Sequence, residues 1–238
     1  MRIKIELSFD TLTLPIDTQS IIQGWVYHCL GEKMGTFYHD KGYQLEHRKF
    51  KMFTFSKLYG KYEIKDKSIV FSNAAKFYIS SFDPYFIKSI YDTISLTSTV
   101  QLNKYTIKVS NIKVTNNVPF KDGIVTFSSM SALCVYKTDE KRFTHYYSPF
   151  DPEFEELLIE NIKHKYEAYY GVPWTGRFHI VAFNLNKSGV YSFKDIKVKG
   201  HFLTLRIEAD KNTFSILYET GLGMKNSSGF GMLEIVNK

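Results

Sequence analysis

The order of strand-like and helix-like segments is the feature that most limits how this chain folds. Residues 1–9 alternate apolar and polar side chains, as a half-buried strand does, and a helix with an apolar stripe follows from Asp17. The next segments read as two strands (50–59 and 68–82), a helix that opens at Asp83-Pro84, and a strand at 105–114. The order β-α-β-β-α-β is typical of the ferredoxin-like fold.

The second half repeats this order less regularly. We predict a strand at 123–137, a helix at 150–171, strands at 177–185 and 201–209, a short helix at 212–220 and a last strand at 232–236. The sequence therefore predicts an α+β protein of two tandem ferredoxin-like (RRM-like) domains with antiparallel sheets. The predicted domains are residues 1–118, which hold the candidate catalytic residues, and residues 119–238, which hold a glycine-rich loop.

Positive charge is concentrated in the first half of the chain. Residues 1–119 carry sixteen Lys and Arg against ten Asp and Glu, whereas residues 120–238 carry fifteen against fourteen. A basic half of this kind favours a polyanionic partner such as nucleic acid or a membrane surface. A solvated lysine-rich surface would have the same excess of positive charge and is the alternative. Segment 41–67 is the densest part, with eight basic and three acidic residues. We predict that this segment contacts the phosphate backbone of a nucleic acid, and a solvated hairpin is the alternative.

Several features indicate a cytoplasmic protein. Cys29 and Cys134 both fall in apolar segments and are typical of core residues in a reducing compartment. Met1 leads directly into a strand pattern, so we expect no signal peptide. Apolar runs are shorter than the roughly 18 residues that span a bilayer, so we expect no membrane association.

A cluster of four glycines precedes the last predicted strand, in "GLGMKNSSGFGM" at 221–232. A dinucleotide fingerprint lies between a strand and a helix, whereas this cluster follows a helix and precedes a strand. A P-loop requires Gly-Lys-Ser/Thr, which Lys225 does not satisfy. An RNA-recognition strand would need further aromatic residues after "GFG". Backbone N–H groups beside Lys225 are thus predicted to contact phosphate, and a tight helix-to-strand connection is the alternative.

With this glycine spacing on two ferredoxin-like halves, the chain resembles the CRISPR repeat-processing endoribonucleases that make guide RNAs. The resemblance covers the whole chain, including the first strand, "QGWVYHCL" (23–30), "KMFTFSKL" (51–58) and the terminal loop. It implies CRISPR repeat RNA as the partner and cleavage without a metal or other cofactor. A homodimer and membership of an RNA-guided interference complex both stay open. So do a non-cleaving RNA-binding scaffold of the same family and an unrelated protein that binds a small phosphorylated ligand.

Cleaving RNA without a metal needs a proton acceptor for the 2′-OH, a proton donor for the 5′-oxygen, and positive charge at the phosphorane. Histidine suits proton transfer near neutral pH. Four of the seven histidines are scattered over separate elements of the second half, and His28 lies beside the apolar stripe of the first helix. His39 and His47 share a segment (35–51) that we predict to be a polar loop.

The resemblance distinguishes these two histidines. It implies His39 in "FYHD" as the catalytic histidine, Tyr27 as the active-site tyrosine and Lys51 as the active-site lysine. On a helical wheel Tyr27 falls opposite the apolar stripe, so its phenol is predicted to point away from the core.

No zinc-like spacing joins His28, His39 and His47, and no acidic cluster resembles a two-metal nuclease, so we expect no metal site. The residues predicted to bind RNA are Gly221, Gly223, Lys225, Gly229, Gly231, Arg48 and Lys49.

Overall fold

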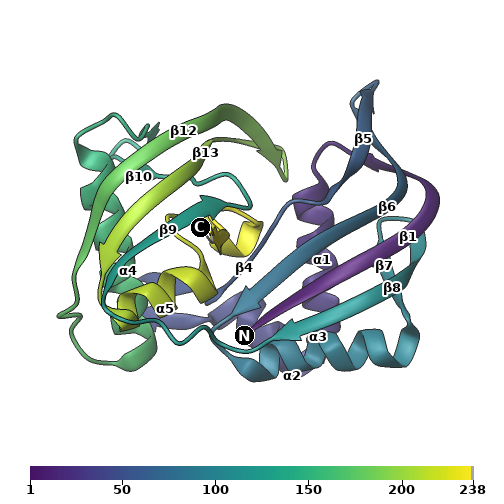
Figure 1. Ribbon diagram of the computed structural model, residues 1–238, viewed down its shortest axis with the longest axis horizontal. Helices are drawn as coiled ribbons and strands as arrows, with labels where there is room; N and C mark the ends of the chain where they lie inside the picture. Colours follow the sequence, from purple (N-terminus) through teal and green to yellow (C-terminus); the bar gives the residue numbers. More distant parts are fainter. Residues whose placement is uncertain (237–238) are drawn as a thin grey trace.

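The computed structural model describes residues 1–236 and contains two large antiparallel sheets side by side, each with helices on one face (Figure 1), and two two-stranded sheets, β2-β3 and β10-β11. The first half contains β1 (Arg2–Pro15), α1 (Thr18–Cys29), α2 (Gly31–Thr36), the π-helix η1 (Phe37–Lys41), β2 (Tyr43–Leu45), β3 (Arg48–Phe50), β4 (Phe53–Phe55), β5 (Tyr59–Lys65), β6 (Ser68–Ser81), α3 (Pro84–Thr97), β7 (Thr99–Leu102) and β8 (Tyr105–Thr115). The second half contains β9 (Gly123–Ser129), β10 (Tyr136–Thr138), β11 (Thr144–Tyr146), α4 (Glu153–Tyr170), β12 (Phe178–Phe193), β13 (Ile196–Ala209), α5 (Lys211–Thr220), the 3-10 helix η2 (Asn226–Ser228) and β14 (Leu233–Ile235). Within residues 1–236, no helix is both long and apolar enough to cross a membrane.

The first sheet has the strand order β4-β6-β1-β8-β7, and β5 pairs with a further part of β6. The first long strand, β1, lies between β6 and β8 in antiparallel pairing with both. Ile3, Ile5 and Leu7 alternate along β1 and are fully buried in the core shared with α1 and α3. The period-2 pattern thus buries one side of the strand, as the sequence predicts.

The second sheet has the order β12-β13-β9-β14, so its first strand, β9, again lies between two later strands. Its core lies between the sheet and helices α4 and α5, and it includes the buried side chains of Phe127, Leu205 and Phe214. Each half therefore has the β-α-β-β-α-β order in an antiparallel sheet. The predicted fold class, two tandem ferredoxin-like units, is confirmed.

One predicted strand, 123–137, is wrong in its second part. Strand β9 ends at Ser129, and the chain is irregular until β10 begins at Tyr136. The carbonyls of Ala132 and Cys134 accept hydrogen bonds from N–H groups of the segment 221–232. This stretch therefore bonds to the glycine-rich segment and keeps a single bridge to β13, between Leu133 and His201.

The predicted strand at 50–59 is also interrupted. Met52, between β3 and β4, has a φ of +49°. Such a left-handed conformation is unusual for a residue with a side chain like Met, and it often marks a functional site. It directly follows Lys51, one of the predicted catalytic residues.

Candidate active site

The three predicted catalytic residues lie together at one edge of the first half. Tyr27 is on α1, His39 is on η1, and Lys51 follows β3. The rings of Tyr27 and His39 meet edge to face, with centroids 5.1 Å apart. The Lys51 Nζ donates a hydrogen bond to the backbone carbonyl of His39. The structure brings together the residues that the resemblance implies, and their catalytic roles stay predictions. We call these three residues the catalytic cluster.

The segment around His39 is helical, so the prediction of a polar loop at 35–51 is wrong for its first part. After α1, the chain continues into α2 and then into one turn of π-helix, η1. Gly42, with a φ of +66°, ends η1, and a Cβ there would lie 2.6 Å from the carbonyl oxygen of Phe50. The helical backbone directs His39 toward Tyr27. His47, by contrast, lies in the tight turn between β2 and β3 and is exposed.

Two lysines bind the carbonyl end of η1. Besides Lys51, which binds the His39 carbonyl, the Nζ of Lys49 donates to the carbonyl of Asp40 at 3.0 Å. Ammonium groups are favoured at this end of a helix because the free carbonyls carry partial negative charge. Partial burial lowers the pKa of Lys51, and the nearby charge of Lys49 lowers it further, while Asp40 opposes the shift. Lys51 is thus a cation held beside the His39 backbone.

Tyr27 is half-buried, so the prediction that its phenol points away from the core is wrong. Its ring packs edge to face on Phe53 with centroids 5.9 Å apart, beside the core of the first half. The helical wheel assigned that side of α1 to solvent, but η1 and β4 cover it. Burial, with a smaller effect from the Asp40 carboxylate, raises the pKa of Tyr27 to about 12. At neutral pH the phenol keeps its proton and serves as a hydrogen-bond donor.

Asp40 is a site residue that the sequence analysis did not identify. Its Oδ1 lies 2.6 Å from the Nδ1 of His39, and both side chains are exposed. The hydrogen bond to His39 is the main cause that holds the pKa of Asp40 below its usual value, and the charges of His39, Lys51 and Lys49 add to it. A partner at Nδ1 leaves the Nε2 of His39 available to a substrate. The adjacent "HD" pair was the available signal.

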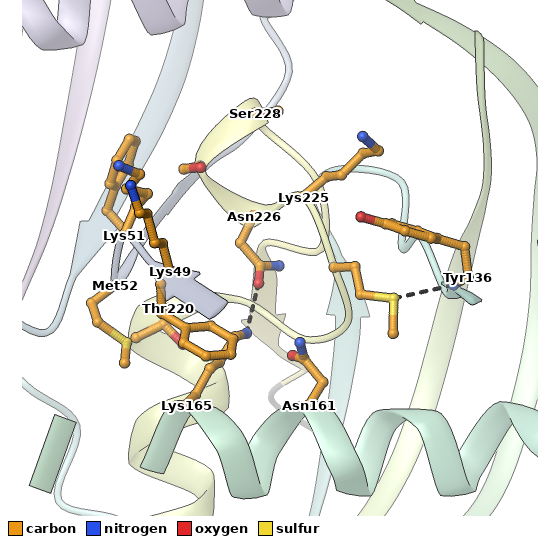
Figure 2. Close-up of a pocket in the computed structure, with 14 residues that line it drawn as sticks. Lys49, Lys51, Met52, Tyr136, Asn161, Lys165, Thr220, Lys225, Asn226 and Ser228 are labelled. Atoms are coloured by element: carbon orange, nitrogen blue, oxygen red, sulfur yellow. Dashed lines mark hydrogen bonds between the residues drawn. The ribbon is translucent and has the colours of Figure 1, made fainter. Parts of the chain in front are cut away.

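A cavity of about 320 Å³ lies between the two halves, beside the catalytic cluster (Figure 2). The first half contributes residues 49–53, and the second contributes side chains from α4 and from residues 224–228. Four lysines line it: Lys49, Lys51, Lys165 and Lys225.

The lining residues of this cavity, all within the part of the chain that the structure describes, include no Asp or Glu. Within residues 1–236, no three His, Cys, Asp or Glu side chains are grouped to hold a metal ion. The cavity is suited to a polyanion.

The glycine-rich loop, residues 221–232, closes one side of this cavity and is largely buried. All four of its glycines have positive φ. A Cβ on Gly231 would lie 1.9 Å from the carbonyl oxygen of Leu222, and one on Gly223 would lie 2.7 Å from that of Cys134. The N–H groups of residues 222, 224, 228, 229 and 231 bond within the protein. The fold itself therefore requires these glycines, and their contact with RNA stays a prediction.

Lys165, on α4, is a second residue that the sequence analysis missed. Its Nζ donates to the Gly221 carbonyl at 2.7 Å and to the Oδ1 of Asn226 at 2.6 Å, beneath the glycine-rich loop (Figure 2). Burial lowers its pKa to about 7. A signal was present, because Lys165 falls three residues after buried Ile162 on the apolar side of α4. A lysine at such a position indicates a specific partner.

Two other predicted RNA-binding residues already have partners in the protein. The guanidinium of Arg48 contacts the Oε1 of Glu160 at 3.1 Å and the ring of His164, both on α4. Lys225 has a φ of +56°, and its Nζ lies 5.4 Å from the ring centroid of Tyr136. Arg48 thus ties the β2–β3 hairpin to the second half, while Lys225 lines the cavity.

Comparison with known proteins agrees with this architecture. A family model described as "CRISPR associated protein Cas6, C-terminal" matches residues 113–235. The chain is 26% identical over 240 residues to CRISPR-associated endoribonuclease Cas6 1 of Methanocaldococcus jannaschii, covering 98% of this chain and 92% of that protein. Two solved structures cover 100% of this chain and 99% of their own: a Cas6-related protein of Pyrococcus furiosus (TM-score 0.83, 22% identity) and a CRISPR associated protein Cas6 (TM-score 0.77, 25% identity). The predicted family is confirmed, and the chain belongs to the Cas6 family of CRISPR-associated proteins.

Proposed function

We propose that this protein binds CRISPR repeat RNA and cuts it by metal-independent transesterification to generate guide RNAs. The observation that carries the proposal is the meeting of Tyr27, His39 and Lys51, of which Lys51 also lines a cavity with three further lysines. The relatives named endoribonucleases support the reaction class. We assign catalysis to a domain of residues 1–118 and RNA anchoring mainly to a domain of residues 119–238. A cytoplasmic location, where thiols such as Cys29 stay reduced, belongs to the same proposal.

The proposed reaction is an in-line displacement at one phosphate. The 2′-oxygen bonds to phosphorus as its proton leaves, and the bond from phosphorus to the 5′-oxygen breaks as that oxygen gains a proton. The products are a 2′,3′-cyclic phosphate and a 5′-OH. We assign one of the two proton transfers to the Nε2 of His39, which Asp40 leaves free by bonding Nδ1.

The other two members of the catalytic cluster have electrostatic roles in this proposal. Tyr27 keeps its proton at neutral pH, so its phenol would donate a hydrogen bond to the scissile phosphate or the 2′-oxygen. Lys51 would place positive charge beside the phosphorane, where negative charge develops in the transition state. Lys49, Arg48, Lys225 and the glycine-rich loop would bind the RNA backbone on either side of the cut.

The reaction class is tested with repeat RNA in excess EDTA. We expect cleavage to proceed, with a cyclic phosphate on one product and a 5′-OH on the other. A single 2′-deoxy nucleotide before the cut should abolish cleavage and leave binding intact, because the nucleophile is missing. A strict requirement for Mg²⁺, or cleavage of the deoxy-substituted RNA, would contradict the proposal.

A further inference from the structure

One face of α1 carries Gln19, Gln23 and Tyr27, spaced four residues apart. Side chains at i, i+4 and i+8 lie on the same side of a helix. Tyr27 belongs to the catalytic cluster, and the other two are amides with no part in the chemistry proposed above. Along the helix axis, Gln23 is about 6 Å and Gln19 about 12 Å from Tyr27, at 1.5 Å per residue.

Both glutamines bind the glycine-rich loop. The Nε2 of Gln23 donates to the Ser227 carbonyl at 2.7 Å, and the Nε2 of Gln19 donates to the Gly229 carbonyl. Gln23 is only 6% exposed, although its side chain is polar. The polar face of α1 is therefore an interface with the second half.

The same helix is fixed at its first turn as well. The Oδ1 of Asp17 caps the helix by accepting from Ser20, and its Oδ2 accepts from the backbone N–H of Lys194 in the β12–β13 turn, at 2.9 Å. Strand β4 also contacts the loop, through Thr54, which donates to the Phe230 carbonyl, and the second half holds it through Lys165 and the carbonyls of Ala132 and Cys134. Helix α1 thus joins the glycine-rich loop to the catalytic cluster through one rigid element.

We propose that Gln19 and Gln23 are positioning residues that hold the glycine-rich loop in a fixed alignment with Tyr27 and His39. RNA anchored at the loop would then reach the catalytic cluster in one register, with a defined phosphate beside His39. This inference rests on the proposed function. A misplacement of about 1 Å in an active site costs about 10²-fold in rate, whereas a neutral hydrogen bond contributes little to stability. Alignment and folding are therefore separable by experiment.

The test compares Gln23→Leu and Gln19→Leu with Thr54→Val. Thr54, on β4, is buried and donates to the Phe230 carbonyl at 3.1 Å, so its loss also removes one hydrogen bond to the loop but leaves α1 untouched. Each variant is measured with repeat RNA for affinity and for single-turnover rate at saturating RNA, after circular dichroism has confirmed folding. Gln19 is partly exposed, so Gln19→Leu still tests the inference if Gln23→Leu does not fold.

We expect both glutamine variants to cut at least about tenfold more slowly, or at neighbouring phosphates as well, with affinity within about threefold of the wild type. Thr54→Val should cut within about threefold of the wild-type rate and at the same phosphate. Wild-type cleavage by the glutamine variants would overturn the inference. So would an equal loss in Thr54→Val, which indicates general loosening of the loop, or a loss confined to affinity. If the wild-type protein itself does not cut, the proposed function fails and the inference fails with it.

Discussion

The catalytic cluster and the glycine-rich loop, which both contribute residues to the cavity between the halves, are built in opposite ways. The imidazole of His39 is 61% exposed and is held by an aromatic contact and one neighbouring carboxylate. The loop is mostly buried. Its backbone is hydrogen-bonded to the segment between β9 and β10, to Lys165 and to α1. Side chains that perform chemistry need access to substrate, whereas a loop that sets the position of RNA needs rigidity. Changes in the cluster should alter rate, and changes in the loop should alter stability and binding.

The largest expected effect on stability comes from Gly231→Ala. The new Cβ would meet the Leu222 carbonyl at 1.9 Å in a backbone with a φ of +71°, so the loop must rearrange. We expect a loss of more than about 2 kcal/mol in the free energy of unfolding, together with weaker RNA binding. Gly171→Ala is the matched control, because its φ is +69° but a Cβ there would have no atom within 4 Å. Equal losses in the two variants, by urea denaturation, would show that the loop tolerates the Cβ.

The second prediction separates the two lysines at the end of η1. Lys51→Ala should slow single-turnover cleavage at saturating RNA by about 10- to 100-fold, because a cation beside the phosphorane is lost. Lys49→Ala should mainly weaken binding and reduce its salt dependence, while cleavage at saturating RNA stays near the wild-type rate. If Lys49→Ala instead cut slowly and Lys51→Ala only bound more weakly, the catalytic lysine would be Lys49.

The third prediction concerns pH and the buried Lys165. Its pKa falls from 10.5 to about 7 on folding, so the unfolded chain binds a proton that the folded protein has released between these values. Lys165 therefore makes the free energy of unfolding increase as pH rises from about 7 to about 10. The increase is up to about 1.4 kcal/mol per pH unit. Lys165→Met should lack this slope, whereas Lys163→Met, at an exposed position, should keep it. Parallel urea titrations of the three proteins at pH 7 and pH 9 measure it. Identical slopes would mean that Lys165 is fully charged when folded.

The smallest expected effect is that of Asp40→Asn. Asp40 orients an exposed imidazole, so its loss should slow cleavage by only several-fold. Asp139→Asn removes a similar exposed carboxylate, 3.0 Å from His145 in the second half, and should leave the rate unchanged. Single-turnover rates of both variants at pH 7 show whether Asp40 orients His39 or has no role in cleavage. A wild-type rate for Asp40→Asn would indicate that His39 needs no orienting partner.

The sequence predicted the fold class well because strand alternation and helix starts are local patterns. It was less successful where a partner comes from a distant part of the chain. The helical wheel placed Tyr27 on the solvent side of α1, since it assumes one buried face per helix. In the structure η1 and β4 cover that side. Likewise, the glycines suggested phosphate contact, whereas close backbone packing already accounts for them.

The central claim, that catalysis resides in the helical turn carrying His39, is tested most directly by comparing His39→Ala with His47→Ala. Both are measured in EDTA on repeat RNA, for single-turnover rate and for affinity. Removing a general acid or base typically costs about 10²- to 10⁴-fold in rate, so His39→Ala should lose at least about 10²-fold with nearly unchanged affinity. His47→Ala, in the exposed β2–β3 turn, should cut almost normally. Near-normal cleavage by His39→Ala would contradict the account.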